Sequence, residues 1–463
     1  MNEVLILIIY GMLMIGTNVF LKRNQDVESY CVSNRQMKTV QSAMGIAASW
    51  VWAPSLLVAA ERAYVSGVAG LFWFLVPNVL TLLIFIPFAK KIRKEMPKGI
   101  TLSGYMKDKY DSDGVKNVYL LELTGLAVCS TAVQMLAGGK LLSMLTGLPF
   151  MVITLLLAVI VFSYAHFSGI KSSVLAETIQ LLVIISIVIA FAGGSLKEAG
   201  MQSWINGLSG ISGEYGSIFS AKGAEVFFSF GLSSAIGLLA GPFGDQCFWQ
   251  RAFAIKEKSI GKAFALGALL FALVPLSMGI IGFVAAGTGF MATDKSIVNF
   301  EYLMSAFPRW IVIPFLIMFL SGLLARLDSN LSAVSSLTTD MFKRSSIKIS
   351  KISMILLLLA GILISNIPGL TVTHLFLFYG TIRATTLLPT VLTLKGVKLT
   401  ATGVISGILI AFIVGLPVFA YGNVYNLSAY KTAGSLIAVL SAGIISVLVS
   451  KLSLRGEWYS NGK

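Results

Sequence analysis

Thirteen apolar stretches, each long enough to cross a bilayer as a helix, follow one another along the chain. A hydrocarbon layer about 30 Å thick needs roughly 20 mostly apolar residues in helical form. The predicted spans are residues 3–21, 41–67, 70–89, 117–146, 148–166, 172–194, 225–250, 262–287, 308–341, 352–368, 370–394, 400–421 and 432–450. Of the 463 residues 56% are hydrophobic and 12% are charged, more apolar surface than a soluble core can bury. The pattern therefore predicts an all-α polytopic membrane protein.

Lysine and arginine residues occupy mainly every second gap between these stretches. The segments 22–39, 90–116, 167–171, 251–262, 342–351, 395–399 and 451–463 hold 26 of the 35 basic residues. Basic loops stay on the cytoplasmic side, so we expect the N-terminus outside and the C-terminus inside a multi-pass protein of the plasma membrane. The net charge of +15 then reflects topology and the anionic inner leaflet, and nucleic-acid binding is not expected.

The sequence gives no indication of enzymatic chemistry. It contains no nucleophile motif, phosphate-binding loop or zinc-ligand spacing. Cys31, Cys129 and Cys247 are far apart and are interpreted as packing residues, and His166 and His374 are interpreted as helix-end or packing residues. We therefore expect no enzyme and no cofactor, and no metal beyond a possible sodium ion.

Two of the predicted spans contain helix-breaking sequences. Pro54 lies in the middle of the second span, where it removes a backbone donor and frees a carbonyl four residues earlier. The seventh span is rich in small residues over 230–237 and continues with Gly241 and Pro242. Non-helical backbone at membrane depth must be covered by protein or line a cavity. A simple kink at Pro54 is the alternative, but two broken helices five spans apart indicate an inverted repeat with a midplane site.

Three motifs then resemble the sodium/solute symporter family. They are the run Asp245–Ala254 with Lys256 and Lys258, the run Ala63–Gly67, and the run Thr338–Lys343. The resemblance implies a LeuT-type fold, a 5+5 inverted repeat with one extra N-terminal and two extra C-terminal helices. The implied parts are 1–40 (extra helix and loop), 41–194 (first repeat), 195–224 (extracellular loop), 225–395 (second repeat) and 396–463 (two C-terminal helices and a short tail).

Within that family, the tracts 50–57 and 67–73 look most like the urea-transporting branch. The resemblance implies a small polar solute, urea-like or otherwise nitrogenous. The polar residues of galactose-transporting members have no counterparts here, which disfavours a sugar. The residues beside the two breaks that we expect to contact solute are Trp52, Ser55, Trp73, Phe227 and Phe230.

The family's shared sodium site is altered in this chain. In relatives, two carbonyls that match Ala48 and Val51 meet a carbonyl that matches Ser321 and two hydroxyl groups. The hydroxyl positions fall on Leu324 and Ala325, which carry none. Sodium needs several oxygen ligands.

Charged residues lie close to this position. Arg326 follows directly, and its guanidinium can supply a fixed positive charge. Glu177 and Asp328 match positions of a second sodium site in some members. A charge in mid-membrane normally faces a cavity or a partner.

Three interpretations of these charges remain open. Arg326 could form an inert buried ion pair with Glu177 or Asp328. It could instead replace sodium, which would make the protein a sodium-independent facilitator or exchanger. Finally, Glu177 and Asp328 could bind sodium or a proton.

Among the other charged residues, Glu61 and Arg62 lie at the outer end of the second span and Arg383 lies within the eleventh span. Glu61, Arg62 and Arg383 are possible gate residues, with interfacial anchoring or a structural salt bridge as the alternatives. Glu122 and Glu225 are expected near helix ends and hydrated.

Taken together, the sequence predicts a secondary transporter that works by alternating access between the two sides of the membrane. Its expected partners are a small polar solute and the lipid bilayer, with Na⁺ or H⁺ as the coupling ion. A transporter-like receptor that does not transport is the rival from another class, and a channel is disfavoured because no filter motif occurs. The sequence does not indicate an oligomeric state.

Overall fold

The computed structural model describes residues 3–19, 26–167, 169–342 and 344–460. The end of the first predicted span, part of the loop after it, Lys343 of the third motif and the last three residues lie outside this description. The helices are α1 (Glu3–Val19), α2 (Val27–Val32), η1 (Ser33–Arg35), α3 (Thr39–Trp50), α4 (Ala53–Glu95), α5 (Leu102–Tyr110), α6 (Asp113–Thr146), α7 (Phe150–Ala165), α8 (Ile170–Ala199), α9 (Met201–Gly207), α10 (Ala221–Val226), η2 (Phe227–Gly231), α11 (Leu232–Leu239), α12 (Gln246–Ala254), η3 (Glu257–Ser259), α13 (Ile260–Gly287), η4 (Lys295–Ile297), α14 (Val298–Ala306), η5 (Arg309–Ile311), α15 (Val312–Met341), α16 (Ile347–Ser365), α17 (Val372–Lys395), α18 (Ala401–Ile410), η6 (Ala411–Gly415), α19 (Leu416–Val424) and α20 (Ser428–Ser460).

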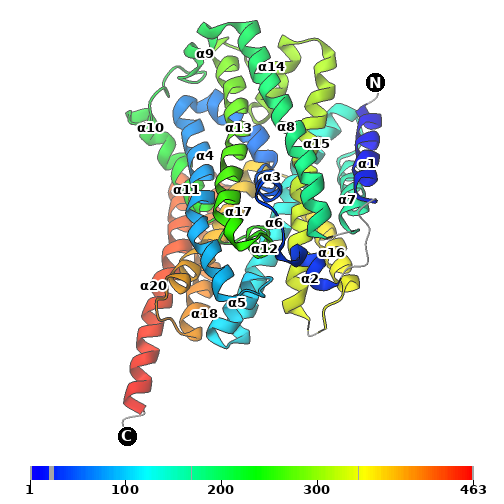
Figure 1. The fold of residues 1–463 in the computed structure, drawn as a ribbon. Coiled ribbons are helices and arrows are strands. Elements are labelled where there is room, and N and C mark those ends of the chain that lie inside the picture. The colour runs from blue at the N-terminus through cyan, green and yellow to red at the C-terminus, as the bar shows by residue number, and fades with distance from the viewer. Residues whose placement is uncertain (1–2, 20–25, 168, 343, 461–463) are drawn as a thin grey trace.

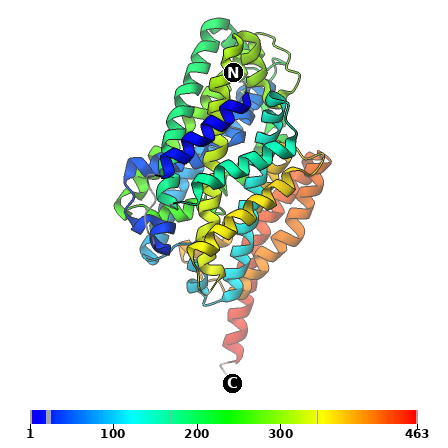
Figure 2. The same cartoon turned by 90° about the vertical axis from the view of Figure 1, so that its right-hand side faces the viewer.

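The long helices run side by side in one bundle (Figures 1 and 2). α1 lies on the outside of the bundle against α7, α8 and α15, while α18 and α19 pack on α20. Figure 1 shows the start of α1 toward one end of the bundle and the end of α20 beyond the opposite end. This placement agrees with an odd number of membrane crossings, but which end faces the cytoplasm stays a prediction.

The predicted number of thirteen spans is not confirmed. In the described residues, nine helices are long and apolar enough to cross a membrane, and two shorter apolar helices cover Glu3–Thr17 and Phe150–Ala165. Two predicted spans merge in α4, which bends at Ser66 and Gly67. Gly67 has a positive φ of 53°, and a Cβ there would lie 2.5 Å from the carbonyl oxygen of Leu208. A residue with a side chain would therefore be strained at this bend.

The centre of the bundle is polar as well as apolar. α15 is buried along most of its length and carries Arg326, Asp328, Ser329 and Asn330 inside the protein. Buried polar groups cost free energy unless they find partners. Their concentration on one central helix marks the place where a functional site can be built.

A backbone bridge joins the start of α3 to the end of α12. The Met37 amide donates to the Ala254 carbonyl at 3.2 Å, and the Lys256 amide donates to the Met37 carbonyl at 3.2 Å. The Gln250 side chain also donates to the carbonyl of Cys31 at 2.8 Å. The segment before α3 is thus fastened to α12 by main-chain hydrogen bonds.

Candidate solute and ion site

The first break separates α3 from α4. Helix α3 ends at Trp50. Val51 and Trp52 have extended backbones with ψ of 113° and 174°, and α4 begins at Ala53 with Pro54 in its first turn. Proline fits there because the first-turn amides have no partner inside the helix. The break therefore lies where the sequence predicted it.

The second break separates α11 from α12. The π-helical turn η2 leads into α11, which ends at Leu239, and α12 starts at Gln246 after an irregular segment. A Cβ at Gly241 of this segment would lie 2.3 Å from the ring of Trp50. The two breaks therefore lie against each other inside the bundle, and the division into two inverted repeats stays a prediction.

Arg326 lies between the two breaks and has a partner for each of its three nitrogens. Nη2 donates to the Asp245 carboxylate at 2.6 Å and to the Tyr379 hydroxyl at 2.7 Å. Nη1 donates to the carbonyl of Ser49 at 3.1 Å, and Nε donates to the Ser130 hydroxyl at 3.0 Å. With the side chain only 2% exposed, this is a desolvated ion pair with supporting hydrogen bonds.

Asp245 carries a second guanidinium. Arg383 Nη2 lies 3.2 Å from the same carboxylate oxygen and also donates to the Tyr379 hydroxyl. Its charge sits 5.1 Å from the ring centroid of Trp50. Asp245 also caps α12 by accepting the Cys247 amide at 3.0 Å. Sequence reasoning used Asp245 only as part of a motif; its position directly after a Gly-Pro break and before a helix was the signal that could have marked it.

The predicted pairing of Arg326 with Glu177 or Asp328 is wrong. Glu177 pairs with Arg251 of α12, whose Nη2 lies 2.6 and 2.7 Å from its two oxygens. Asp328 is two residues from Arg326 and so points to another face of α15, because only residues three or four apart share a helix face. Asp328 is buried, and its Oδ2 has no hydrogen-bond partner.

The two charged groups meet at the last turn of α3. The Ser49 carbonyl accepts from Arg326, while the Ser49 hydroxyl lies 3.4 Å from Glu177 and 2.8 Å from the Ser329 hydroxyl. Ser329 also donates to Glu177. Arg326 and Glu177 are thus linked through Ser49, together with Asp245 and Arg251, which the sequence did not indicate; a place for Asp328 in the same region stays a prediction.

Of the predicted sodium ligands, Ala48 and Val51 lie at the first break, where α3 ends. Ala48, Val51 and Ala325 are completely buried. The Ser321 hydroxyl faces α1 and lies 2.7 Å from the Tyr10 hydroxyl. The next residue of α15, Gly322, faces the break, since a Cβ there would lie 2.7 Å from the Leu56 side chain and 3.8 Å from the Val51 side chain. The roles of the Ala48, Val51 and Ser321 carbonyls stay predictions.

The predicted solute contacts form two groups. The Trp52 ring lies 5.4 Å from Phe376 and 5.1 Å from Tyr379, and Ser55 is buried one turn later. In the second group, Trp73 lies 4.8 Å from Phe227. Phe230 lies under the Arg62 guanidinium at 4.4 Å. Within the described residues, no ring contact joins Trp73 to Trp52.

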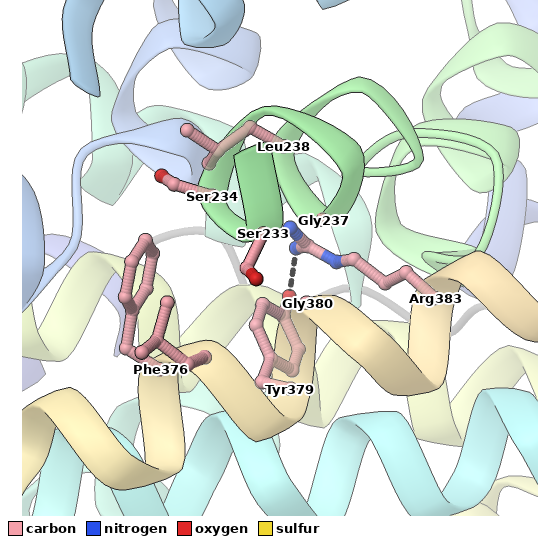
Figure 3. Close-up of a pocket in the computed structure, with 9 residues that line it drawn as sticks. Ser233, Ser234, Gly237, Leu238, Phe376, Tyr379, Gly380 and Arg383 are labelled. Carbon is pink, nitrogen blue, oxygen red and sulfur yellow. Dashed lines mark hydrogen bonds between the residues drawn. The ribbon is translucent and has the colours of Figure 1, made fainter. Parts of the chain in front are cut away.

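A small cavity of about 10 Å³, room for one water molecule, lies between α11 and α17 (Figure 3). Its lining residues are Ser233, Ser234, Gly237, Leu238, Phe376, Leu377, Tyr379, Gly380 and Arg383. Phe376 and Tyr379 connect it to Trp52. None of the five predicted solute contacts lines this cavity, whereas the predicted gate residue Arg383 does. Within the described residues, the Ser234 hydroxyl has no hydrogen-bond partner.

The other predicted gate residues lie elsewhere. Glu61 and Arg62 form an ion pair of 3.0 Å and are mostly buried. Glu61 lines a separate small cavity of about 20 Å³ together with Lys140 and Thr373. The structure therefore separates the Glu61–Arg62 pair from Arg383. Among the described residues, no three His, Cys, Asp or Glu side chains gather as a group that could hold a metal ion.

The model of the sodium:solute symporter family matches residues 30–411. The chain belongs to this family. A probable urea active transporter of Schizosaccharomyces pombe is 28% identical over 287 residues, which cover 58% of this chain and 42% of that relative. A urea-proton symporter of Oryza sativa is 23% identical over 487 residues, which cover 92% of this chain and 66% of that relative. The chain thus spans less than two thirds of the length of these relatives.

Solved structures of symporters share the fold. A Na⁺-coupled sialic acid symporter superposes with a TM-score of 0.78 at 15% identity, covering 97% of this chain and 98% of that one. The LeuT-type, all-α fold predicted from the sequence is therefore confirmed. The family and these relatives are transporters rather than enzymes, in agreement with the prediction.

Proposed function

We propose that this sodium:solute symporter family member is a secondary transporter that carries a small polar solute, urea or a close relative of urea, by alternating access. The relatives' names support the solute class, since two of them are urea transporters. The family and the two facing breaks support the mechanism.

The small cavity between α11 and α17 is the proposed solute site, and it must widen during the transport cycle to admit a urea-sized molecule. It combines the hydroxyls of Ser233 and Ser234 with the aromatic faces of Phe376 and Tyr379. Hydroxyl groups both donate and accept, so they suit the carbonyl and amide groups of a urea-like molecule. Trp52 forms the neighbouring aromatic wall, while Ser55, Trp73, Phe227 and Phe230 remain proposed contacts in another state of the cycle.

We further propose that Arg326 takes the place of the family's shared sodium ion. The single observation that carries this step is the 3.1 Å hydrogen bond from Arg326 to the carbonyl of Ser49 at the end of α3, which lies in the chain between the predicted ligands Ala48 and Val51 but is neither of them. A cation bound at the break would take such carbonyls as ligands, and a guanidinium supplies the same charge without dissociating. Leu324 and Ala325 offer no hydroxyl group to sodium.

The experiment uses the purified full chain in liposomes loaded with unlabelled urea. Uptake of labelled urea by counterflow is measured in sodium and in potassium. We expect uptake in both salts at equal rate. Uptake without accumulation under any ion gradient would indicate a facilitator or exchanger, and solute binding without uptake would indicate a receptor.

Two variants test the role of Arg326. Replacing Leu324→Ser, Ala325→Ser and Arg326→Ala together restores hydroxyl ligands and removes the fixed charge, so uptake should become faster in sodium than in potassium. The matched control keeps Arg326 and carries only Leu324→Ser and Ala325→Ser; it should stay indifferent to sodium. Strict sodium dependence of the unmodified chain would refute the proposal that Arg326 replaces the ion.

A further inference from the structure

Glu122 is a buried carboxyl group that the proposed solute and ion sites do not use. It lies on α6 and is completely buried, so the expectation that Glu122 is hydrated near a helix end is wrong. Glu225, for which the same was expected, is exposed. Among the described residues, neither carboxyl oxygen of Glu122 has a hydrogen-bond partner. A carboxylate in such a place loses its hydration without compensation. Adding a proton removes the charge and with it most of that cost.

The surroundings of Glu122 connect it to the second break. A Cβ at Gly244 would lie 2.8 Å from Glu122 Oε1 and 2.9 Å from the Cα of Arg383. Thr386 of α17 lies beside the carboxyl, but the two side chains do not meet the geometry of a hydrogen bond, and the Thr386 hydroxyl has no other partner. Glu122 therefore lies between α6, the irregular segment before α12, and α17.

The charged and titratable groups around Glu122 come from several elements. Asp245 before α12 and Arg383 on α17 act on it electrostatically. Tyr119 on α6 lies near it and is hydrogen-bonded to Thr390 at 2.9 Å, with Tyr110 of α5 beyond. From α15, Arg326 forms an ion pair with Asp245.

Arg383 links this carboxyl to the cavity. It lines the cavity, where its Nη2 donates to the Tyr379 hydroxyl (Figure 3). Nη2 also donates to Asp245, while Nε has no hydrogen-bond partner in the part of the chain that the structure describes. A negative Glu122 competes with Asp245 for this guanidinium, whereas a neutral Glu122 does not. The charge of Glu122 can thus decide whether Arg383 stays on the cavity wall.

A proton suits this place better than a metal cation. Sodium needs several oxygen ligands around it. Here the Gly244 backbone closes one side of the carboxyl and a guanidinium lies near another, so both room and charge are unfavourable for a metal ion. A proton needs only one carboxyl oxygen.

We infer that Glu122 is a proton-binding site, which takes up a proton from water as a carboxylate, releases it again as a carboxylic acid, and acts on the solute cavity through Arg383. The link to solute movement rests on the proposed transport function. The proton binding itself does not, and the two are tested separately.

The first experiment detects the proton on the purified full chain without any solute. Infrared difference spectra between acidic and alkaline buffer should show a carboxylic-acid carbonyl band that disappears in Glu122→Gln. Glu122→Asp, which keeps a titratable carboxyl, should retain a shifted band and guards against loss of the fold. Asp328→Asn tests whether the band comes instead from Asp328, another buried carboxyl group. Glu225→Gln is the control at an exposed carboxyl group. An unchanged band in Glu122→Gln would overturn the inference.

The second experiment measures transport in liposomes with a proton gradient and labelled urea. We expect accumulation in the unmodified chain, and in Glu122→Gln a loss of accumulation to equal concentrations inside and outside, with counterflow retained. Gradient-driven accumulation equal to the unmodified chain would overturn the coupling. If the unmodified chain moves no urea by counterflow, the proposed function fails, and the infrared band still decides whether Glu122 binds a proton.

Discussion

Arg326 shows how one side chain can hold several helices together. Its partners come from α3, α6, the segment before α12, and α17. Each hydrogen bond to a charged group in a buried place is stronger than a neutral one. Removing such a residue leaves its partners without compensation, which costs more than the bond itself contributes.

We therefore expect Arg326→Ala to lower the stability of the purified protein by about 3 kcal/mol or more, because a buried ion pair loses one member. Thermal unfolding in detergent measures the change. The control is Arg309→Ala: this side chain is 86% exposed and lies 3.8 Å from Glu3, so about 0.5 kcal/mol or less is expected. Equal effects of the two substitutions would contradict the ion-pair account.

Residue types predicted local backbone better than long-range partners. Pro54 and the glycines around Gly241 indicated both breaks, because these residues act on their own backbone. The partners of Arg326 and Glu177 could not be predicted in the same way. Asp245 and Arg251 come close to them only through the packing of α12, and spacing along the sequence carries no information about that.

At the scale of elements, the contact between α11 and α17 forms the wall of the cavity. A Cβ at Gly237 would lie 2.7 Å from the Cα of Gly380. The two helix backbones therefore approach closely because both residues lack side chains. Both glycines also line the cavity.

We expect Gly237→Ala to destabilise the protein by about 1–3 kcal/mol, since the added methyl group must push the two backbones apart. Gly125→Ala is the matched control: it lies inside helix α6 with open space around it. There the better helix propensity of alanine should leave stability unchanged or raise it by up to about 1 kcal/mol. Thermal unfolding of both variants compares them, and a harmless Gly237→Ala would show that this contact is loose.

A second element contact depends on pH. Lys140 of α6 lies 2.5 Å from Asp294, which precedes η4. Burial alone would raise the pKa of Asp294, but hydrogen bonds from Lys140 and Ser296 lower this pKa below its usual value. The stabilisation is therefore present above the unfolded pKa of about 3.9 and is lost as the pH falls through the lower folded pKa.

Asp294→Asn should accordingly lower stability at neutral pH by about 0.5 kcal/mol, a small value because the side chains are partly exposed and solvent screens the pair. Melting temperatures of the variant and the unmodified chain should converge in strongly acidic buffer. A difference that persists there would mean that the ion pair is not its cause.

The sequence predicted the long elements well and the short ones poorly. Apolar length reveals a span, so most of the long helices coincide with predicted stretches. Short helices such as α2, α5, α9 and α14 lie in segments interpreted as loops. Their few residues give too little periodicity for detection, and contacts with the bundle decide their conformation.

At the scale of the whole molecule, orientation in the membrane is the main open prediction. The basic segments predict that residues 251–262 face the cytoplasm and that 195–224 lies outside. The three native cysteines are buried, so single engineered cysteines can be labelled against a low background.

We expect Phe219→Cys, at a position that is 92% exposed, to react with an impermeant maleimide in intact cells. Lys258→Cys, also at an exposed position, should react only after the membrane is opened. The reverse pattern would invert the topology and with it the assignment of the basic segments.

The bridge between Met37 and Ile255 has a mechanical consequence. It fastens the start of α3 to the end of α12. α3 is the half before the first break, and α12 is the half after the second break. Under alternating access, the two halves would then swing as one lever about a shared axis. A solute that tilts one half would therefore move both halves. One hinge would then be enough, whereas two unconnected half-helices would need a hinge each.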